Sequence, residues 1–464
     1  MSHVVSWMLA AAGVLASLPA SADEDLKALR TEIAQMKHAY EQRIAALEQR
    51  LALAAQAGHV ADGPADGHAE HFHAADEGSE PEMGLVLQGR FRKMKEMEAE
   101  ARAVAGYWPA GHDHDGNERG FSLQHAELRL AANVGAKFRG VARFAVGEAG
   151  DVEVEEASFT TLGLGHGWMV RGGRFASGVG YQNARHPHEW DFADASLMQV
   201  ALFGAEGYRQ DGLQLQWAAP TASLLAFGAE LGRGATFPGT DRNRNGAGAV
   251  ALFARVGGPR GDGSAWQAGL SYLGTRAEGR EAHFEDTDPL GPNEVSGAFS
   301  GRSRTLIADF VWQWAPQGDG QTGGVRFQAE VFRRSENGTL GCTSDVATSP
   351  CLGGVSLGAL DARQTGGYWQ AVYQFLPQWR VGYRHDWLSP GRKSYDPAVV
   401  FAALDRDGSY FSGHKPRRDS AMVDWGDSES SRLRLQFARD RSMPGVTDHQ
   451  WTLQYIMHLG SHAH

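Results

Sequence analysis

The stretch Gln450-Trp-Thr-Leu-Gln-Tyr-Ile-Met-His-Leu459, near the end of the 464-residue chain, decides the fold class. Every second residue in it is apolar or aromatic, namely Trp451, Leu453, Tyr455, Met457 and Leu459. Successive side chains of a strand point to opposite faces, so this segment has one apolar face and one mostly polar face. That repeat is typical of a strand in a membrane-spanning β-barrel, which faces lipid outside and water inside.

The same alternation recurs from Gly84 onward and predicts an all-β, transmembrane antiparallel barrel of about sixteen strands, an even number within the bacterial range. A soluble β-sandwich also alternates, but it would place its polar face outside. The predicted strands are residues 84–92, 121–133, 136–146, 152–161, 168–174, 208–217, 222–232, 248–257, 265–275, 304–314, 324–334, 366–375, 378–388, 418–425, 430–440 and 448–459.

The connections between these strands support the count. A barrel with both chain ends in the periplasm alternates short periplasmic turns with longer outer loops. With sixteen strands, the long connections all fall on one side: 93–120, 175–207, 233–247, 276–303, 335–365 and 389–417. Leu197 to Phe203 is also strand-like, but an extra strand there would break the pattern, so we assign 175–207 wholly to an outer loop.

Four segments organise the chain. Residues 1–22 combine an apolar run with an A-x-A-like site and predict a signal peptide. Residues 23–55 place apolar residues at alternating three and four spacing, which predicts a short α-helical coiled coil in the periplasm or, alternatively, a single amphipathic helix on the barrel. Residues 56–83 form a flexible linker rich in His, Ala and Gly, and residues 84–464 form the barrel. A coiled coil implies a homo-oligomer, for which we expect a trimer.

The composition of the chain excludes further classes of protein. The mean hydropathy is -0.38 and no segment after the leader is a long apolar run, so any membrane crossing must use strands. The net charge of -11 gives no basic footprint for nucleic acid. Cys342 and Cys351, the only cysteines, predict a disulfide that staples a loop, with metal ligation as a distant second interpretation.

The polar faces of the predicted strands would line the lumen, where water tolerates charges and charges tune selectivity. The alternative is that these residues only pair with one another on a solvated wall. The predicted wall residues are Arg139, Arg143, Arg326, Arg380, Arg384, Arg432 and Arg434, with Glu127, Glu230, Asp309, Glu330 and Asp386.

The third outer loop contains Asn183-Ala-Arg-His-Pro-His-Glu-Trp-Asp-Phe-Ala-Asp194. In porins this loop commonly folds into the barrel, so we expect it to form the constriction. Glu189, Asp191 and Asp194 would then face wall arginines and create a transverse field. The predicted constriction residues are Arg185, His186, His188, Glu189, Asp191 and Asp194.

Histidine clusters suggest metal capture. His186 and His188, with Glu189 and Asp191, have the side chains of transient zinc ligands, although their spacing matches no structural zinc motif. Further histidines are His112 and His114 in the first outer loop, His68, His71 and His73 in the linker, and His458, His462 and His464 near the C-terminus. For any single one, a solvated histidine is the alternative. We expect no required cofactor beyond a transient Zn²⁺.

The sequence predicts no enzyme. It contains no Gly-x-Ser-x-Gly, no His-Glu-x-x-His and no phosphate-binding glycine loop. Nothing in the spacing of its Ser, His and Asp residues isolates a triad.

Several long stretches resemble one family. They are 173–194, Asp211-Gly-Leu-Gln-Leu-Gln-Trp-Ala-Ala-Pro-Thr221, 228–239, and the ending with Arg432-Leu-Arg-Leu-Gln-Phe-Ala-Arg-Asp440, Pro444-Gly-Val-Thr-Asp448 and Gln454-Tyr-Ile-Met457. They resemble bacterial zinc-regulated, so-called TonB-dependent, outer-membrane receptors, and the resemblance implies expression linked to zinc supply. The chain has no room for the plug domain of a TonB-dependent receptor. Its architecture is more similar to phosphate-selective and other specific porins.

These observations lead to an outer-membrane channel for passive, selective uptake of small solutes or ions, with zinc or another divalent metal as the expected cargo. One alternative is an anion-selective porin for phosphate or carboxylates, favoured by the wall arginines. Another is a barrel-anchored surface protein that binds metal or a partner without transport. A soluble periplasmic β-protein is the weakest interpretation, because the aromatic stripes suit lipid.

Overall fold

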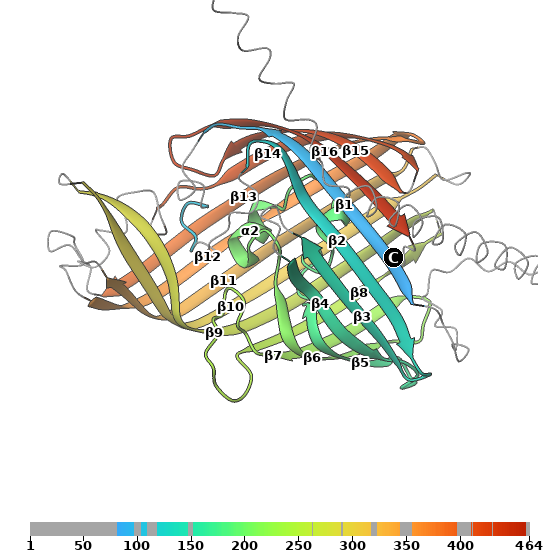
Figure 1. The fold of residues 1–464 in the computed structure, drawn as a ribbon, viewed down its shortest axis with the longest axis horizontal. Coiled ribbons are helices and arrows are strands. Elements are labelled where there is room, and N and C mark those ends of the chain that lie inside the picture. Colours follow the sequence, from blue (N-terminus) through green and yellow to red (C-terminus); the bar gives the residue numbers. More distant parts are fainter. Residues whose placement is uncertain are drawn as a thin grey trace, which may run out of the picture. The chain divides into compact units, whose positions relative to one another are not determined.

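The described residues form a closed, porin-like antiparallel barrel of sixteen strands (Figure 1). The computed structural model describes residues 81–96, 104–108, 118–146, 152–261, 263–288, 291–316, 323–343, 355–396, 410, 412–428 and 430–460. Each strand pairs with its sequence neighbours, and β1 closes the barrel against β16. The strands are β1 Glu82–Lys93, β2 Gly120–Val134, β3 Phe138–Val146, β4 Val152–Thr161, β5 Trp168–Ala176, β6 Arg209–Ala218, β7 Leu224–Gly232, β8 Ala249–Arg260, β9 Ser264–Asp288, β10 Gly291–Trp314, β11 Val325–Thr343, β12 Val355–Leu376, β13 Trp379–Asp396, β14 Arg417–Ser428, β15 Ser431–Arg441 and β16 Asp448–Gly460.

The apolar and polar residues that alternate in the sequence lie on the outer and inner faces of the barrel wall, respectively. In β16, Trp451, Leu453 and Tyr455 are exposed on the outside, whereas Thr452 and Gln454 are buried on the inside. The prediction of an all-β barrel with about sixteen strands is confirmed. β1 begins at Glu82, two residues before the expected first strand.

Three of the predicted outer loops were wrong in part. β9 and β10 continue to Asp288 and from Gly291, so most of 276–303 is a paired hairpin. β11 and β12 likewise extend into 335–365, and β13 extends to Asp396. Beyond the apolar band a strand needs no lipid-facing side chains, so its alternation fades while backbone pairing continues.

The connection between β5 and β6 contains no extra strand. Leu197–Phe203 is the short helix α2, so leaving this segment out of the strand count was correct. Ser196 caps the helix by accepting a hydrogen bond from the backbone N–H of Gln199, and Gly204 ends it with φ of 84°. Among the described residues, no helix is long and apolar enough to cross a membrane.

The hydrophobic core lies inside the barrel, around α2 (Figure 1). Leu197, Leu202 and Phe203 are buried with inward-facing residues of several strands, including Ile307 and Phe332. Residues 104–108 of the first outer connection join the same core, and Gln364 Nε2 donates to the Gly106 carbonyl at 2.7 Å. Two outer connections therefore fold into the barrel.

The predicted signal peptide, coiled coil and most of the linker lie outside the described residues. His68, His71, His73, His112, His114, His462 and His464 lie there too, as do Cys351 and the side chain of Cys342. These assignments stay predictions.

Candidate functional site: the inner loop and its wall

Residues 177–208, which we call the inner loop, cross the interior of the barrel. The loop leaves and rejoins the wall at one place, because Ser177 N donates to the Tyr208 carbonyl at 3.0 Å, directly above the paired ends of β5 and β6. Asn183 holds this base together: its side-chain amide donates to the Ser177 carbonyl and its oxygen accepts from Tyr208 N. The expectation that this connection folds inward agrees with the structure.

Wall carboxylates hold the first part of the loop by its backbone. Glu330 on β11 accepts from Tyr181 N and Gln182 N, both at 2.8 Å. Glu230 on β7 accepts from Gly178 N and from the Ser177 hydroxyl. Buried N–H groups must find partners, so these two glutamates set the path of the loop.

Wall arginines hold the later part through two loop aspartates. Asp194 pairs with Arg384 at 2.8 Å and with Arg418 at 2.9 Å, and Asp191 pairs with Arg380 at 3.3 Å. Burial alone would raise the pKa of Asp194, but the two guanidinium groups outweigh it and hold its pKa well below its usual range. These aspartates therefore contact the arginines directly, whereas Glu189 pairs only with Arg185 of its own loop at 3.8 Å.

The predicted wall residues are divided between attachment of the loop and pairing within the wall. Asp386 accepts from Leu197 N at the start of α2, and Arg434 donates to the Trp190 carbonyl. Arg139 pairs with Glu82, and Arg143 pairs with Glu127 and Glu156. These contacts show attachment of the loop and pairing within the wall, whereas lumen lining by the predicted wall residues stays a prediction.

One face of the constriction exposes guanidinium groups, and we call it the arginine face: Arg185, Arg326, Arg380 and Arg432. Their side chains are 41, 28, 24 and 31% exposed, whereas Asp191 and Asp424 beside them are 4 and 2% exposed. A cavity lined in part by Arg185, Asp191 and Arg326 lies next to it. This cavity has room for about one water molecule, and Glu189, 31% exposed, also lines it. On the arginine face itself, the guanidinium groups are more exposed than Asp191 and Asp424.

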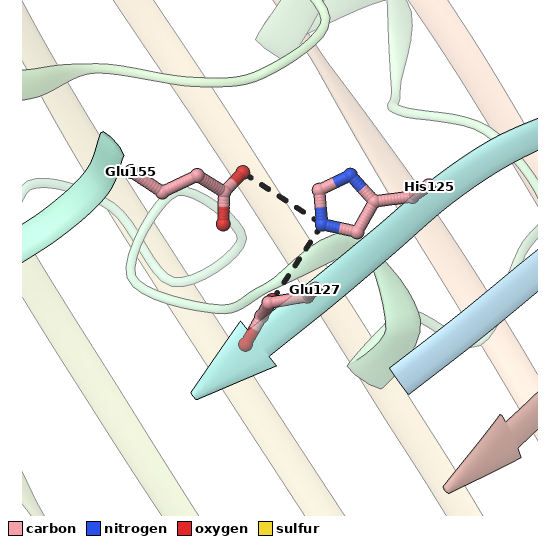
Figure 2. A group of neighbouring side chains, drawn as sticks. All are labelled: His125, Glu127 and Glu155. Atoms are coloured by element: carbon pink, nitrogen blue, oxygen red, sulfur yellow. Dashed lines mark ion pairs between the residues drawn. The ribbon is translucent and has the colours of Figure 1, made fainter. Parts of the chain in front are cut away.

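A second cluster lies where two predicted metal ligands of the inner loop meet the wall at β2 and β4. Figure 2 shows His125 and Glu127 of β2 beside Glu155 of β4. His186 and His188 of the inner loop join them: each Nδ1 lies within 3.6 Å of Glu127 Oε2. We call these five residues the histidine–glutamate cluster. Burial lowers the pKa of His188 to about 3 even though Glu127 opposes the shift, so this imidazole is neutral at pH 7.

No protein-family model matches the sequence, so the resemblance to zinc-regulated receptors stays a prediction. An uncharacterized protein of Aquifex aeolicus is 27% identical over 409 residues, which cover 82% of this chain and 79% of that protein.

Among solved structures, the chain is similar to a loop-deletion mutant of OmpT, an outer-membrane protein of Vibrio cholerae, with 10% identity and a TM-score of 0.47; the match covers 82% of this chain and 99% of that one. An anion-selective porin from Comamonas acidovorans has 9% identity and a TM-score of 0.45, with coverage of 82 and 99%. OprB of Pseudomonas putida has 11% identity and a TM-score of 0.45, with coverage of 82 and 94%.

Sequence analysis missed His125 and Glu155, and it placed Glu127 only among the wall charges. A signal was present. A β-bulge at Gln124 breaks the register between β1 and β2, and another at Glu155 breaks it between β3 and β4. In the sequence, each bulge appears as a break in the alternation of apolar and polar residues. The apolar Leu123 is followed two positions later by the polar His125, and the two glutamates Glu155 and Glu156 are consecutive. Bulges re-aim side chains at functional sites.

Proposed function

We propose that this protein is an outer-membrane channel of porin type that admits small solutes passively through a barrel narrowed by the inner loop. The observation that carries the proposal is the anchoring of residues 177–208 to the wall by Glu330, Asp386 and Asp194. A sixteen-stranded barrel is wide enough for an aqueous channel. An internal loop fixed by ion pairs reduces that channel to a selective one.

The arginine face favours small anions, such as phosphate or carboxylates, as the solute. Exposed guanidinium groups attract anions and give carboxylates and phosphates bidentate hydrogen bonds. The balancing carboxylates Asp191 and Asp424 are buried, so a passing ion can contact the guanidinium groups but not these carboxylates. Zinc or another divalent cation as cargo, the expectation from the resemblance and the histidines, is the second candidate.

Single-channel recording of the refolded mature protein in a salt gradient tests the function. We expect discrete open steps with a reversal potential that shows anion preference. A cation preference would instead support the divalent-metal cargo. Silence from protein that is demonstrably folded would contradict transport and favour the anchored binding protein.

Substitution of the arginines with the longest ion-pair distances should weaken the preference for anions. Arg185 and Arg432 are suited to this, because their nearest carboxylate contacts are long, at 3.8 and 3.9 Å. A charge about 7 Å from an ion in water changes its energy by about 0.6 kcal/mol, so each Arg→Gln change should lower anion entry about two- to threefold. Arg233→Gln in the β7–β8 connection, 52% exposed, is the matched control, and an equal effect there would refute the assignment.

We also propose that the barrel is a homo-oligomer. The outward-facing pair Arg174 and Asp211, with N–O distance 2.7 Å, is 42 and 47% exposed. Charge facing lipid is unfavourable, and a second copy of the chain would cover the pair. The double variant Arg174→Ala/Asp211→Ala should shift the mass in detergent from oligomer toward monomer. The same changes at Arg233 and Asp241, a pair in the β7–β8 connection, should leave the mass unchanged.

A further inference from the structure

The histidine–glutamate cluster presents five buried polar atoms that no described residue satisfies by a hydrogen bond. They are His125 Nε2, His186 Nδ1, His188 Nδ1, Glu127 Oε2 and Glu155 Oε2. Glu127 and Glu155 are 1 and 2% exposed, and His188 is 7% exposed. A buried polar atom without a partner is costly, and the ligand atoms of His125, Glu127 and Glu155 lie within 4.8 Å of one another, with His186 and His188 close to Glu127. This grouping indicates a ligand at the cluster.

The spacing of these atoms fits a metal ion. Glu127 Oε2 lies 3.6 Å from His125 Nε2, 3.5 Å from His186 Nδ1 and 3.6 Å from His188 Nδ1. In a tetrahedral zinc site with bonds of about 2.0–2.1 Å, neighbouring ligand atoms are about 3.3 Å apart. The observed separations are slightly longer than these edges, and they exceed good hydrogen-bond lengths.

Two arginines outside the cluster orient the carboxylates of Glu127 and Glu155. Arg143 binds the other oxygen of Glu127, and Arg209 binds the other oxygen of Glu155 at 2.6 Å. Each glutamate thus has one oxygen engaged by a guanidinium and a second, buried oxygen without a hydrogen bond from a described residue. Glu155 Oε1, which binds Arg209, also lies 3.8 Å from His125 Nε2 (Figure 2). Metal sites commonly show such hydrogen-bonded outer shells, which fix the ligands before the ion arrives.

We propose that His125, His186, His188 and Glu127 bind one divalent transition metal, with Glu155 beside them as a further carboxylate ligand. Three imidazoles with a carboxylate favour zinc over calcium or magnesium, which take oxygen ligands. The ion would join the inner loop to β2 and β4. The buried position suits a resident ion, and the inference does not require transport.

Metal binding to the detergent-purified full chain tests the site. After chelator treatment, we expect the protein to take up one zinc per chain at the cluster, measured by competition with a chromophoric chelator, and to give the intense visible absorption of tetrahedral cobalt when Co²⁺ replaces zinc. The variant His186→Ala/His188→Ala should lose this binding. Loss of a single ligand, as in Glu127→Gln, should weaken it by more than the about 10–100-fold that removal of an outer-shell partner costs.

Two controls separate this site from the other histidines. His449→Ala, on the outer face of the barrel, should bind as the wild type does. The linker variant His68→Ala/His71→Ala/His73→Ala should keep the cobalt spectrum and the tight zinc. Unchanged binding in the double variant, or loss only in the linker variant, would overturn the proposal.

Folding is checked separately. Each variant should keep the heat-modifiable gel mobility of a closed barrel, and zinc should raise the unfolding temperature of the wild type but not of the double variant. Folded wild-type protein that binds no zinc would also overturn the proposal. Zinc binding by a protein that conducts no ions would support the site and contradict only the proposed channel function.

Discussion

Deletion of residues 178–207, with a short glycine–serine link in their place, is expected to raise single-channel conductance several-fold. The inner loop and α2 fill the barrel beside Phe332 and Ile307, and a sixteen-stranded barrel without such a filling leaves an aqueous channel. Anion preference should rise at the same time, because the deletion removes Asp191 and Asp194 and leaves Arg380, Arg384 and Arg418 without these carboxylates. Planar-bilayer recording of the deletion variant measures both effects.

The barrel should survive this deletion. The backbone bond between Ser177 N and the Tyr208 carbonyl shows that the two ends of the loop are already in register with β5 and β6. Deletion of residues 243–246, which are exposed in the β7–β8 connection, is the control and should leave conductance unchanged. If the folded 178–207 deletion conducts no better than the wild type, the inner loop is not the constriction.

Asp194→Ala is expected to release the inner loop from the far wall. The change removes the carboxylate between Arg384 and Arg418, both of which are buried. Loss of one partner of a buried ion pair costs about 3–5 kcal/mol, and we expect about 3 because Asp386 still contacts both guanidinium groups. That energy raises the population of the detached loop about 100-fold. Flickering single-channel current and faster proteolysis within 177–208 would report it.

The control for Asp194 lies in the same loop. Glu189→Gln alters only a partly exposed pair with Arg185 at 3.8 Å and should cost less than about 1 kcal/mol. If both variants flicker equally, the contribution of the buried ion pairs to loop attachment is disproved.

Low pH should weaken the attachment of the inner loop in the wild type, as Asp194→Ala does. The pKa of Asp194 in the folded loop is well below its unfolded value of about 3.9, so its contribution is fully present above that value. The contribution is lost as the pH falls through the folded pKa. Current traces should therefore be steady from about pH 8 to pH 5 and become noisier only below about pH 4. A transition near pH 6 would assign the attachment to another group.

The barrel could be predicted from the sequence because its cause is local. Lipid on one side and water on the other impose a period of two on each strand, and this period is visible in segments such as Leu433 to Phe437 without knowledge of their partners. Where neither face meets lipid the period fades. Hairpin extensions such as β9 to Asp288 were therefore taken for loops.

The inward course of the inner loop was predicted but its wall contacts were not, and the constriction that it would form stays a prediction. His186, His188, Asp191 and Asp194 were correctly located on one inward-folding loop, but the sequence does not show which wall residues they meet. Asp194 contacts Arg384 and Arg418, which are 190 and 224 positions away, because barrel closure brings β13 and β14 opposite the loop. Only the three-dimensional register decides such pairs.

By itself, the sequence determined a sixteen-stranded barrel with a charged interior and an inner loop, since side-chain alternation and connection lengths are properties of short segments. The tertiary structure alone decided that His125, Glu127 and Glu155 face His186 and His188. The reason is physical: two β-bulges turn residues of β2 and β4 toward the inside, and a loop from β5 folds across the barrel to meet them. No pattern within one segment of the sequence predicts that three separate segments come into contact.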